Sequence, residues 1–407
     1  MKALSLLIAQ LILCSTVLSA SENNDPLDSY ISKNKKEQFS YDYKKNEAES
    51  SKLRDSWIAP LNLQYSYSES DPYKSVQTSE NAALKMEQPI FQSGGIYYGI
   101  KFAEASRIYT NYSVDVAKRK LVKDAISFLM QIKQMDLKID KQKLQIKNSE
   151  INLELKKEQY LNGQLDSGFL DNAIIERNIV IQALYDIQTN KERLISQFQA
   201  ISDMPYETAL IPHLKMLNKE QFLKYNIVLD MSQSDIEKNR YNKNIIIAKY
   251  LPKVSLTAGY NWSKSNQQYS PTSASIFTEK DYYDYGFKAY IPIDINTFRD
   301  IESSRIDFLK SKTVIEDKKV ELRALFEQVM QNINNFEKKI VLSRENKDIY
   351  EKLLIDTRNL FSAGYKTSFD VELLENSVGI QKIESEVFEM DKQLELLTLY
   401  EMYKNEI

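Results

Sequence analysis

Hydrophobic and polar side chains alternate strictly along one short stretch in the second half of the chain. From residue 254 every second position is apolar, and the positions between them are small or polar: Val254, Leu256, Ala258, Tyr260 and Trp262 against Ser255, Thr257, Gly259, Asn261 and Ser263. This period of two predicts a β-strand over about 254–263 with one apolar and one polar face. Similar alternation predicts strands at about 61–68, 82–90 and 284–293.

Most of the remaining chain has the pattern of long helices. Residues 96–161 and 297–362 contain no proline, and at 1.5 Å per residue each would extend about 100 Å. A short glycine-containing turn follows each, and helices are expected to return over about 169–200 and 369–405. Charged helical segments are expected at about 30–56 and 219–249. Apolar residues with 4-3 spacing predict a coiled-coil seam, with an ordinary buried helix face as the alternative: Leu322, Phe326, Val329, Ile333, Phe336 and Ile340.

The same succession of elements occurs twice along the chain. Three pairs of landmark residues recur in the same order, separated by 192, 203 and 201 positions: Pro60 and Pro252, Pro89 and Pro292, Gly163 and Gly364. A recurring set of landmarks at one spacing indicates an internal duplication. The expected organisation is a first structural repeat over 21–210 and a second over 211–407, each with two strands and a helical hairpin, about 96–200 and 297–405.

The N-terminus has the parts of a secretory signal peptide over residues 1–20. Lys2 supplies the charge, an apolar run follows to Leu13, and small residues surround position 20. A membrane anchor is the alternative, although an 11-residue run is short for a membrane span. Cys14 is the only cysteine, and lipidation at this position is a second alternative. Cleavage near residue 20 would leave a mature chain without cysteine, and so without disulfides.

The strands need partners outside the chain, because two isolated hairpins are marginally stable in water. Apolar and polar faces on strands of about 10 residues are typical of a transmembrane β-barrel, and a soluble sandwich is the alternative. Lys85, Glu87 and Lys288 would then face a wet lumen. Aromatic residues near the strand ends fit an interfacial girdle: Tyr67, Tyr260, Trp262, Tyr282, Tyr283 and Tyr285. The residues expected to face lipid are Leu61, Leu63, Tyr65, Val254, Leu256, Tyr260, Trp262 and Phe287.

Charge and composition exclude several other classes of function. The chain has 54 basic and 57 acidic residues, so it lacks the strongly basic character of a nucleic-acid-binding protein. His213 is the only histidine, and it lies in a linking stretch, which gives it a structural interpretation. No phosphate-binding loop or metal-spaced set of Cys and His is visible, so we expect no enzyme activity, no metal and no cofactor.

Several of these stretches resemble the TolC-like outer membrane efflux proteins. YLPKVSLTAGYNW is similar to that family's strand start, and GFKAYIPI and LKMEQPIFQSGG are similar to its strand-to-helix junction. AGYKTSFDVELLE is similar to its helix–turn–helix tip, and the likeness spans nearly all of the mature chain twice over. The resemblance implies a mainly α-helical homotrimer with a twelve-stranded outer-membrane β-barrel and a long α-helical coiled-coil tunnel in the periplasm. It also implies a periplasmic adaptor (membrane fusion protein) and an inner-membrane RND pump or ABC exporter as partners.

The resemblance also assigns residues to sites. Asp370, with Glu372 and the weaker counterpart Asp171, would form the periplasmic aperture; the alternative for Asp370 is an ordinary acid in the first turn of a helix, where the helix dipole favours it. The tip turns expected to contact the adaptor are Gly163, Gln164 and Leu165 and Gly364, Tyr365 and Lys366. The strand–helix junctions would use Pro89, Gly94, Gly95 and Pro292.

The chain departs from the family pattern at both the junctions and the tips. Asn296-Thr297 stands where the junction would have two glycines, and Asn tolerates the left-handed conformation such a turn uses. The first tip has two more residues before its Asp, and Leu373 replaces the family's second carboxylate. An exit duct is the expected function. The competing hypotheses are a periplasmic or surface coiled-coil scaffold without a pore, and a periplasmic adaptor, whose lipoyl-like module is not evident.

Overall fold

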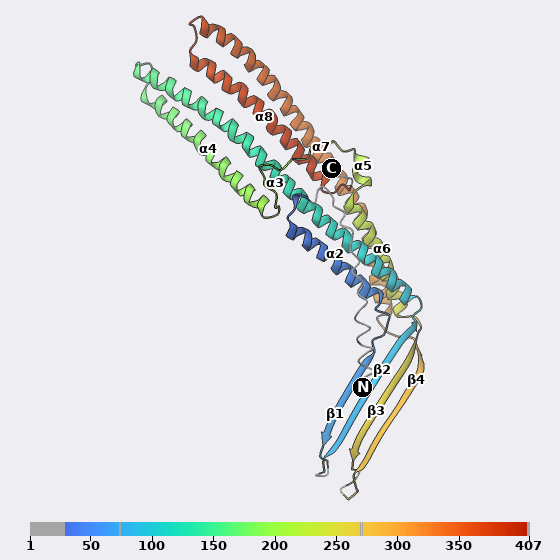
Figure 1. Ribbon diagram of the computed structural model, residues 1–407. Coiled ribbons are helices and arrows are strands. Elements are labelled where there is room, and N and C mark those ends of the chain that lie inside the picture. Colours follow the sequence, from blue (N-terminus) through green and yellow to red (C-terminus); the bar gives the residue numbers. More distant parts are fainter. Residues whose placement is uncertain (1–28, 73–74, 269, 271, 405–407) are drawn as a thin grey trace.

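The computed structural model describes residues 29–72, 75–268, 270 and 272–404, which form one elongated body with a sheet at one end (Figure 1). The first half contains α2 (Lys33–Arg54), β1 (Asn62–Ser70), β2 (Gln77–Phe91), α3 (Gly95–Leu161) and α4 (Ser167–Gln199). The second half contains α5 (Lys219–Lys224), α6 (Ile227–Lys249), β3 (Lys253–Gln267), β4 (Ile276–Tyr290), α7 (Thr297–Ser362) and α8 (Ser368–Tyr400). The predicted signal peptide and Cys14 lie outside the described residues.

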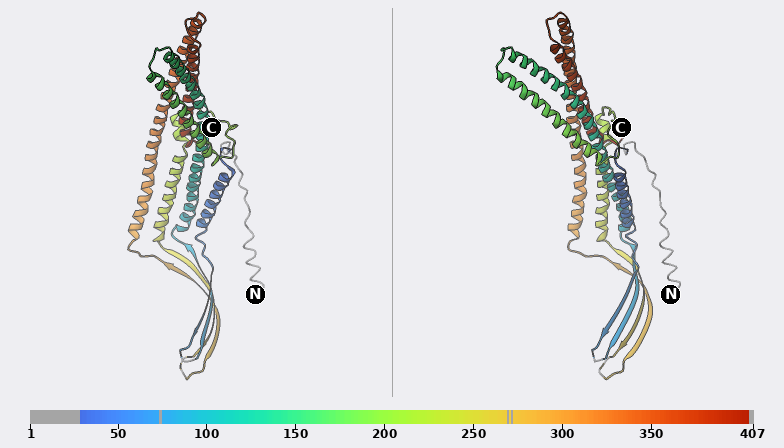
Figure 2. Two further views of the ribbon diagram at one scale, coloured as in Figure 1. Left: turned by 90° about the vertical axis from the view of Figure 1, so that its left-hand side faces the viewer. Right: turned by 60° about the vertical axis from the view of Figure 1, so that its left-hand side comes forward.

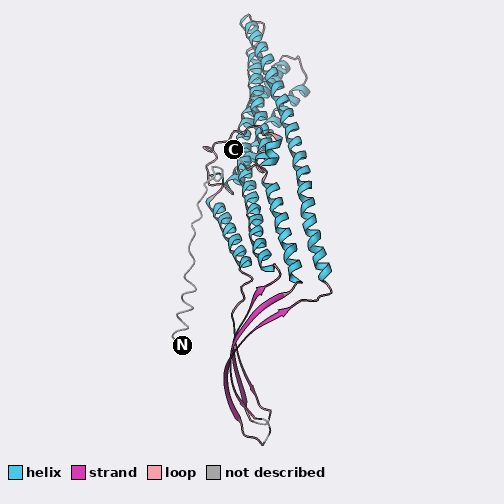
Figure 3. Cartoon of the chain, turned by 90° about the vertical axis from the view of Figure 1, so that its right-hand side faces the viewer, coloured by secondary structure: helices cyan, strands magenta, loops and turns pink. Residues whose placement is uncertain are grey.

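The strands form one antiparallel sheet with the order β1-β2-β3-β4. The two hairpins are joined through β2 and β3, where Leu84 is opposite Tyr260 and Ala82 is opposite Trp262. The sheet is curved and projects from the end of the helices (Figure 3). β2, β3 and β4 each have 15 residues and extend beyond the predicted ranges at their loop ends, because the polar flanking residues continue the ladder.

The helices form two successive arrangements along the long axis. Next to the sheet, α2, α3, α6 and α7 lie side by side, each packed on the next (Figure 2). Farther from the sheet, α3 pairs with α4 and α7 pairs with α8, and the two hairpins contact each other through α3 and α8. Their tips diverge at the far end of the molecule. Thus α3 and α7 run through both arrangements and connect them.

The main hydrophobic core lies where these two arrangements meet. Val122, Ile126 and Met130 of α3 pack with the middle of α7 and the end of α8. In α7, the predicted seam residues Leu322, Phe326, Val329, Ile333 and Ile340 are buried, and Phe336 is half-buried. The apolar spacing therefore identified the inward face of α7 correctly.

The prediction of one continuous helical segment over 219–249 was wrong. The charged segment at 219–249 is broken between α5 and α6, and Asn226 lies at the break. The Asn226 side chain accepts hydrogen bonds from the backbone N–H groups of Val228 and Leu229, at 3.0 and 3.3 Å. An asparagine that bonds to the backbone in this way favours a helix start over a helix interior.

Candidate functional site

The sheet has two chemically distinct faces, and the strand register assigns every residue to one of them. Paired residues of antiparallel strands share a face. Gln88, Leu256 and Phe287 therefore lie on one face, as do Leu84, Tyr260 and Tyr283. We call this the apolar face; its members include the predicted lipid-facing residues Leu63, Tyr65, Val254, Leu256, Tyr260, Trp262 and Phe287. Leu61 immediately precedes β1 and is also exposed.

The apolar face is the more exposed of the two in β3. Leu256, Ala258 and Tyr260 are exposed, whereas the alternating residues Thr257, Gly259 and Asn261 are half-buried. At the sheet edges Leu63 is 78% exposed and Phe287 is 77% exposed. Among the described residues no helix packs extensively on either face. A soluble sheet would bury this apolar surface, so the arrangement is the reverse of the usual one.

The opposite face of the sheet is polar and carries cross-strand contacts. Lys288 donates to Glu87 at 3.4 Å, and the Asn261 amide donates to Asp284 at 2.6 Å. Lys85, opposite Gly259, lies on the same face, so the register brings all the charged residues expected in a lumen together. Tyr282 pairs with Asn261 and therefore belongs to this polar face, not to the predicted aromatic girdle.

The first strand–helix junction uses a left-handed turn. Gly94 has φ +89° and precedes α3, and Ser93 also has a positive φ. The Ser93 hydroxyl donates to the carbonyl oxygen of Pro252 at 2.6 Å, which connects this turn to the start of β3. Pro89 lies within β2, next to a register irregularity, while Gly95 begins α3. The predicted turn residues are thus adjacent at one corner of the sheet.

The second junction closes in a different way from the prediction. Asn296 is right-handed, with φ −85°, so it does not replace a left-handed glycine. Instead the Asp294 side chain accepts from the Asn296 N–H at 2.8 Å, and the Thr297 hydroxyl donates to the Asp294 carbonyl at 2.6 Å. Pro292 lies in the segment between β4 and α7. A side-chain turn at Asp294 therefore supplies the reversal.

The two hairpin tips have the same backbone geometry. Gly163 and Gly364 have φ +72° and +82°, and the next residue in each case donates back to the last helical turn. Gln164 N–H bonds to the carbonyl of Gln159 at 2.8 Å, and Tyr365 N–H bonds to that of Leu360 at 2.9 Å. These are left-handed helix ends that favour glycine. Gln164, Tyr365 and Lys366 are exposed and Leu165 is half-buried.

Equal turn lengths correct the predicted pairing of tip carboxylates. The helix after each turn is capped three residues beyond its glycine, by Asp166 in the first tip and Thr367 in the second. The position that corresponds to Asp370 is therefore Phe169, and Asp171 lies two residues farther along α4. The two additional residues that precede Asp171 in the sequence therefore do not lie in the turn, which has the same length in both tips. Asp171 is exposed, but it is not the structural counterpart of Asp370.

Asp370 is held by groups of its own chain. Its carboxylate accepts from the Thr367 N–H and hydroxyl, both at 2.9 Å, and the Thr367 hydroxyl accepts from the Asp370 N–H at 3.2 Å. This is a capping box at the start of α8. The backbone hydrogen bond from Thr367, with a smaller contribution from Lys366, lowers the pKa of Asp370 below its ordinary value. Asp370 therefore stays ionised well below neutral pH, while Glu372 is exposed nearby.

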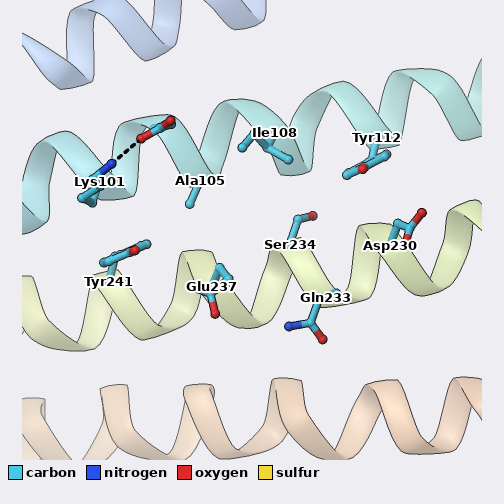
Figure 4. Close-up of a pocket in the computed structure, with 10 residues that line it drawn as sticks. Lys101, Ala105, Ile108, Tyr112, Asp230, Gln233, Ser234, Glu237 and Tyr241 are labelled. Atoms are coloured by element: carbon cyan, nitrogen blue, oxygen red, sulfur yellow. Dashed lines mark hydrogen bonds and ion pairs between the residues drawn. The ribbon is translucent and has the colours of Figure 1, made fainter.

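A groove of about 420 Å³ lies between α3 and α6 (Figure 4). Its carboxylates are Glu104, Asp230 and Glu237, and its apolar wall includes Ala105 and Ile108. Each of these carboxylates pairs with a basic residue: Glu104 with Lys101 at 2.9 Å, Glu237 with Arg240 at 2.6 Å, and Asp230 with Lys404. The groove therefore has a mixed lining without concentrated negative charge.

Neither metal-binding clusters nor membrane-spanning helices occur in the parts of the chain that the structure describes. No three or more His, Cys, Asp or Glu side chains in these parts are placed to hold a metal ion. Their helices also lack any stretch apolar and long enough to cross a membrane. His213 is exposed in the linker between α4 and α5.

The arrangement of sheet, helical layer and paired hairpins matches solved structures over nearly the whole chain. VceC, an outer membrane protein of Vibrio cholerae, has a TM-score of 0.68 and 15% identity, covering 90% of this chain and 92% of its own. The CmeC outer membrane channel of Campylobacter jejuni has a TM-score of 0.70 and 10% identity, covering 94% and 86%. The chain has the TolC-like fold. The MtrE outer membrane channel of Neisseria gonorrhoeae has the same fold, with a TM-score of 0.59, 10% identity and coverage of 90% and 84%.

The sequence motifs thus predicted the TolC-like fold correctly. No protein-family model matches this sequence, and no curated protein matches it significantly. At these identities the TolC-like fold is shared while most side chains differ. The contacts of the sheet and tips must therefore be judged from this chain's own residues.

Some functional candidates of this TolC-like chain were not predicted from sequence. Phe169 is 53% exposed at the first tip, and it was missed because Asp171 was matched with Asp370 by residue type, not by its distance from the paired glycine. A set of carboxylates beyond the predicted strand ends was also missed: Glu69, Glu80, Glu279 and Asp281. Continuing the period-two pattern past the last apolar residue would have assigned them to the apolar face.

Proposed function

We propose that this protein is the outer-membrane exit duct of a tripartite efflux or type I secretion system. The observation that carries the proposal is the apolar face, which is exposed and uncovered by any helix of the described chain. An exposed apolar face of this kind is stable in contact with lipid. The polar face on the other side of the sheet then suits a water-filled lumen. The TolC-like fold supports the same conclusion, since several structures with this fold are outer membrane channels.

Closure of a barrel requires more than one copy of the chain. In the described sheet β1 pairs only with β2 and β4 pairs only with β3, which leaves an unpaired edge on each. The helices at the edges carry exposed apolar residues, such as Ile175 and Ile179 of α4 and Ile349 and Ile355 of α7. Since free edges within a membrane must be paired, we propose a homotrimer in which β1 of one copy pairs with β4 of the next. Three copies would give twelve strands.

Fractionation and bilayer recording test the proposed duct. The full-length protein should sediment with the outer membrane, resist extraction with salt, and form discrete ion-conducting channels as a trimer. A coiled-coil scaffold without a pore would show none of these channels, even where it remains attached to the envelope. A monomer without conductance in an otherwise well-folded preparation would contradict the duct.

The hairpin tips are the proposed contact for a periplasmic adaptor, which would connect the duct to an RND pump or an ABC exporter. Cysteines introduced as Gln164→Cys and Lys366→Cys should form crosslinks to cysteines in the adaptor's helical hairpin in working cells. A cysteine at exposed Tyr41 of α2, far from both tips, is the matched control and should give none. Crosslinks from Tyr41→Cys alone would contradict docking at the tips.

The aperture role of Asp370 is proposed from the same arrangement of copies. Three copies of Asp370 around an axis would form an acidic ring, and acidic rings favour cations. Asp370→Ala is therefore expected to increase conductance or reduce cation selectivity in bilayer recordings.

Thr367→Ala separates this role from helix capping, because it removes the cap while the carboxylate stays. The cap is worth about 1 kcal/mol of helix stability. A Thr367→Ala channel with the full effect of Asp370→Ala would assign the change to capping, and an unchanged Asp370→Ala channel would reject the aperture role.

A further inference from the structure

Four aromatic side chains of the apolar face orient their polar atoms in one direction. The Tyr65 hydroxyl donates to Glu80 at 3.3 Å, and the Tyr67 hydroxyl donates to Glu69 at 2.9 Å. On the neighbouring hairpin, the Tyr260 hydroxyl donates to Asp281 at 3.3 Å and the Trp262 indole N–H donates to Glu279 at 3.1 Å. Each acceptor lies closer than its donor to the loop end of the sheet.

A common orientation of this kind marks a boundary between apolar and aqueous surroundings. Tyr and Trp are amphipathic, and at a membrane surface their rings stay with the hydrocarbon while the polar atoms reach the headgroups and water. Hydrogen bonds scattered by chance would point toward both ends of the strands. The donors on both hairpins point away from the helices and toward the loops, as side chains at one edge of a bilayer would.

The next row of this face beyond Trp262 contains Tyr67 and three charged residues. Glu80 is opposite Lys264, and Lys264 is opposite Glu279, so adjacent strands place charges side by side on the apolar face. A basic side chain on the lipid face costs about 2–4 kcal/mol at the bilayer midplane but almost nothing near the interface. This row is therefore compatible with headgroups or water and not with hydrocarbon.

Strand length agrees with a boundary at this position. A membrane-spanning strand needs about 9–11 residues. The stretch from Val254 to Trp262 contains nine residues and includes the apolar positions of β3, whereas β3 continues to Gln267. The strands are thus longer than a membrane requires, and the excess lies at the loop end.

We infer that the hydrocarbon contact of the sheet ends at the row that contains Tyr65, Ala82, Trp262 and Asp281. Beyond this row, toward the β1–β2 and β3–β4 loops, the strands project past the membrane core, and Glu69, Glu80 and Glu279 face the lipid headgroup layer. On the helix side of this row, the apolar face contacts lipid acyl chains. This inference rests on the proposed membrane location of the sheet, and it adds where along the strands the membrane surface lies.

Tryptophan fluorescence in vesicles tests the boundary, because the chain has only two tryptophans, Trp57 and Trp262. In a full-length Trp57→Phe variant, Trp262 reports the proposed boundary. A second variant, Trp57→Phe/Trp262→Phe/Leu256→Trp, places the reporter three rows deeper on the same strand and face. Both are reconstituted in phosphatidylcholine vesicles that carry bromine either near the headgroup or near the end of the acyl chain.

The inference expects opposite quenching preferences for the two reporters. Trp262 should be quenched more strongly by shallow bromine, and the tryptophan of Leu256→Trp more strongly by deep bromine. If the deep reporter is quenched and Trp262 is either unquenched or quenched more by deep bromine, the boundary is misplaced while the sheet is still in the membrane. If neither reporter is quenched in either lipid, the proposed membrane location fails, and the boundary with it.

Discussion

The variant Leu256→Lys is expected to prevent assembly of the membrane-inserted oligomer, the largest effect we anticipate from a single exposed residue. Leu256 is 49% exposed on the apolar face, within the Val254–Trp262 stretch, and its neighbours across the sheet are Gln88 and Phe287. A lysine on a lipid-facing surface costs about 2–4 kcal/mol at the midplane and less toward the interfaces, and three copies incur the cost three times. The protein should accumulate outside the outer-membrane fraction and be cleared by proteolysis.

Thr257→Lys is the matched control on the adjacent residue. Thr257 points to the polar face, opposite Glu87 and Gly286. The same positive charge there would meet water and a carboxylate, so assembly should be close to that of the unmodified protein. Outer-membrane fractionation combined with unheated gel electrophoresis measures both variants. Equal assembly of the two would show that the apolar face does not contact lipid.

The sequence predicted those features of the fold that depend on residues close together in the chain. Period-two alternation and the absence of proline are local and strong, so they located β3 and placed the bounds of α7 at residues 297 and 362. The burial of Val329 and Ile333 followed from spacing along a single helix. These features depend on residues a few positions apart, which is the range that a pattern in one chain can report.

The predictions were wrong at turns and helix starts, where different side chains can stabilise the same backbone conformation. The second junction turns through Asp294, whose side chain bonds to the backbone, and no positive φ at Asn296 is needed. The break at Asn226 depends on one side chain capping α6, which charge and periodicity do not register. The match of Asp171 with Asp370 by residue type was wrong, because the paired left-handed glycines fix the turn and place Phe169 at the position of Asp370. Local hydrogen bonding therefore decided each position that the pattern missed.

The variant Phe326→Ala is expected to destabilise the junction between the two helical arrangements. Phe326 is 6% exposed in α7, and its ring lies 5.7 Å, centroid to centroid, from that of Phe222 in α5. The same cluster includes Ile126 of α3 and Leu396 of α8, so one side chain contacts a core built from four helices. Truncation of a buried Phe to Ala costs about 3–5 kcal/mol, through lost burial and the cavity that remains.

The control for Phe326→Ala is Val320→Ala, on the same helix at a position that is 60% exposed. An exposed truncation of this kind should change the free energy of unfolding by about 0.5 kcal/mol or less. The measurement is the midpoint of urea unfolding followed by the helical circular dichroism signal. A large shift for Phe326→Ala alone would show that the core at the middle of α7 maintains the connection between the sheet-proximal helices and the hairpins. Equal shifts for both variants would mean that α3 and α7 are held together mainly by contacts elsewhere along their length.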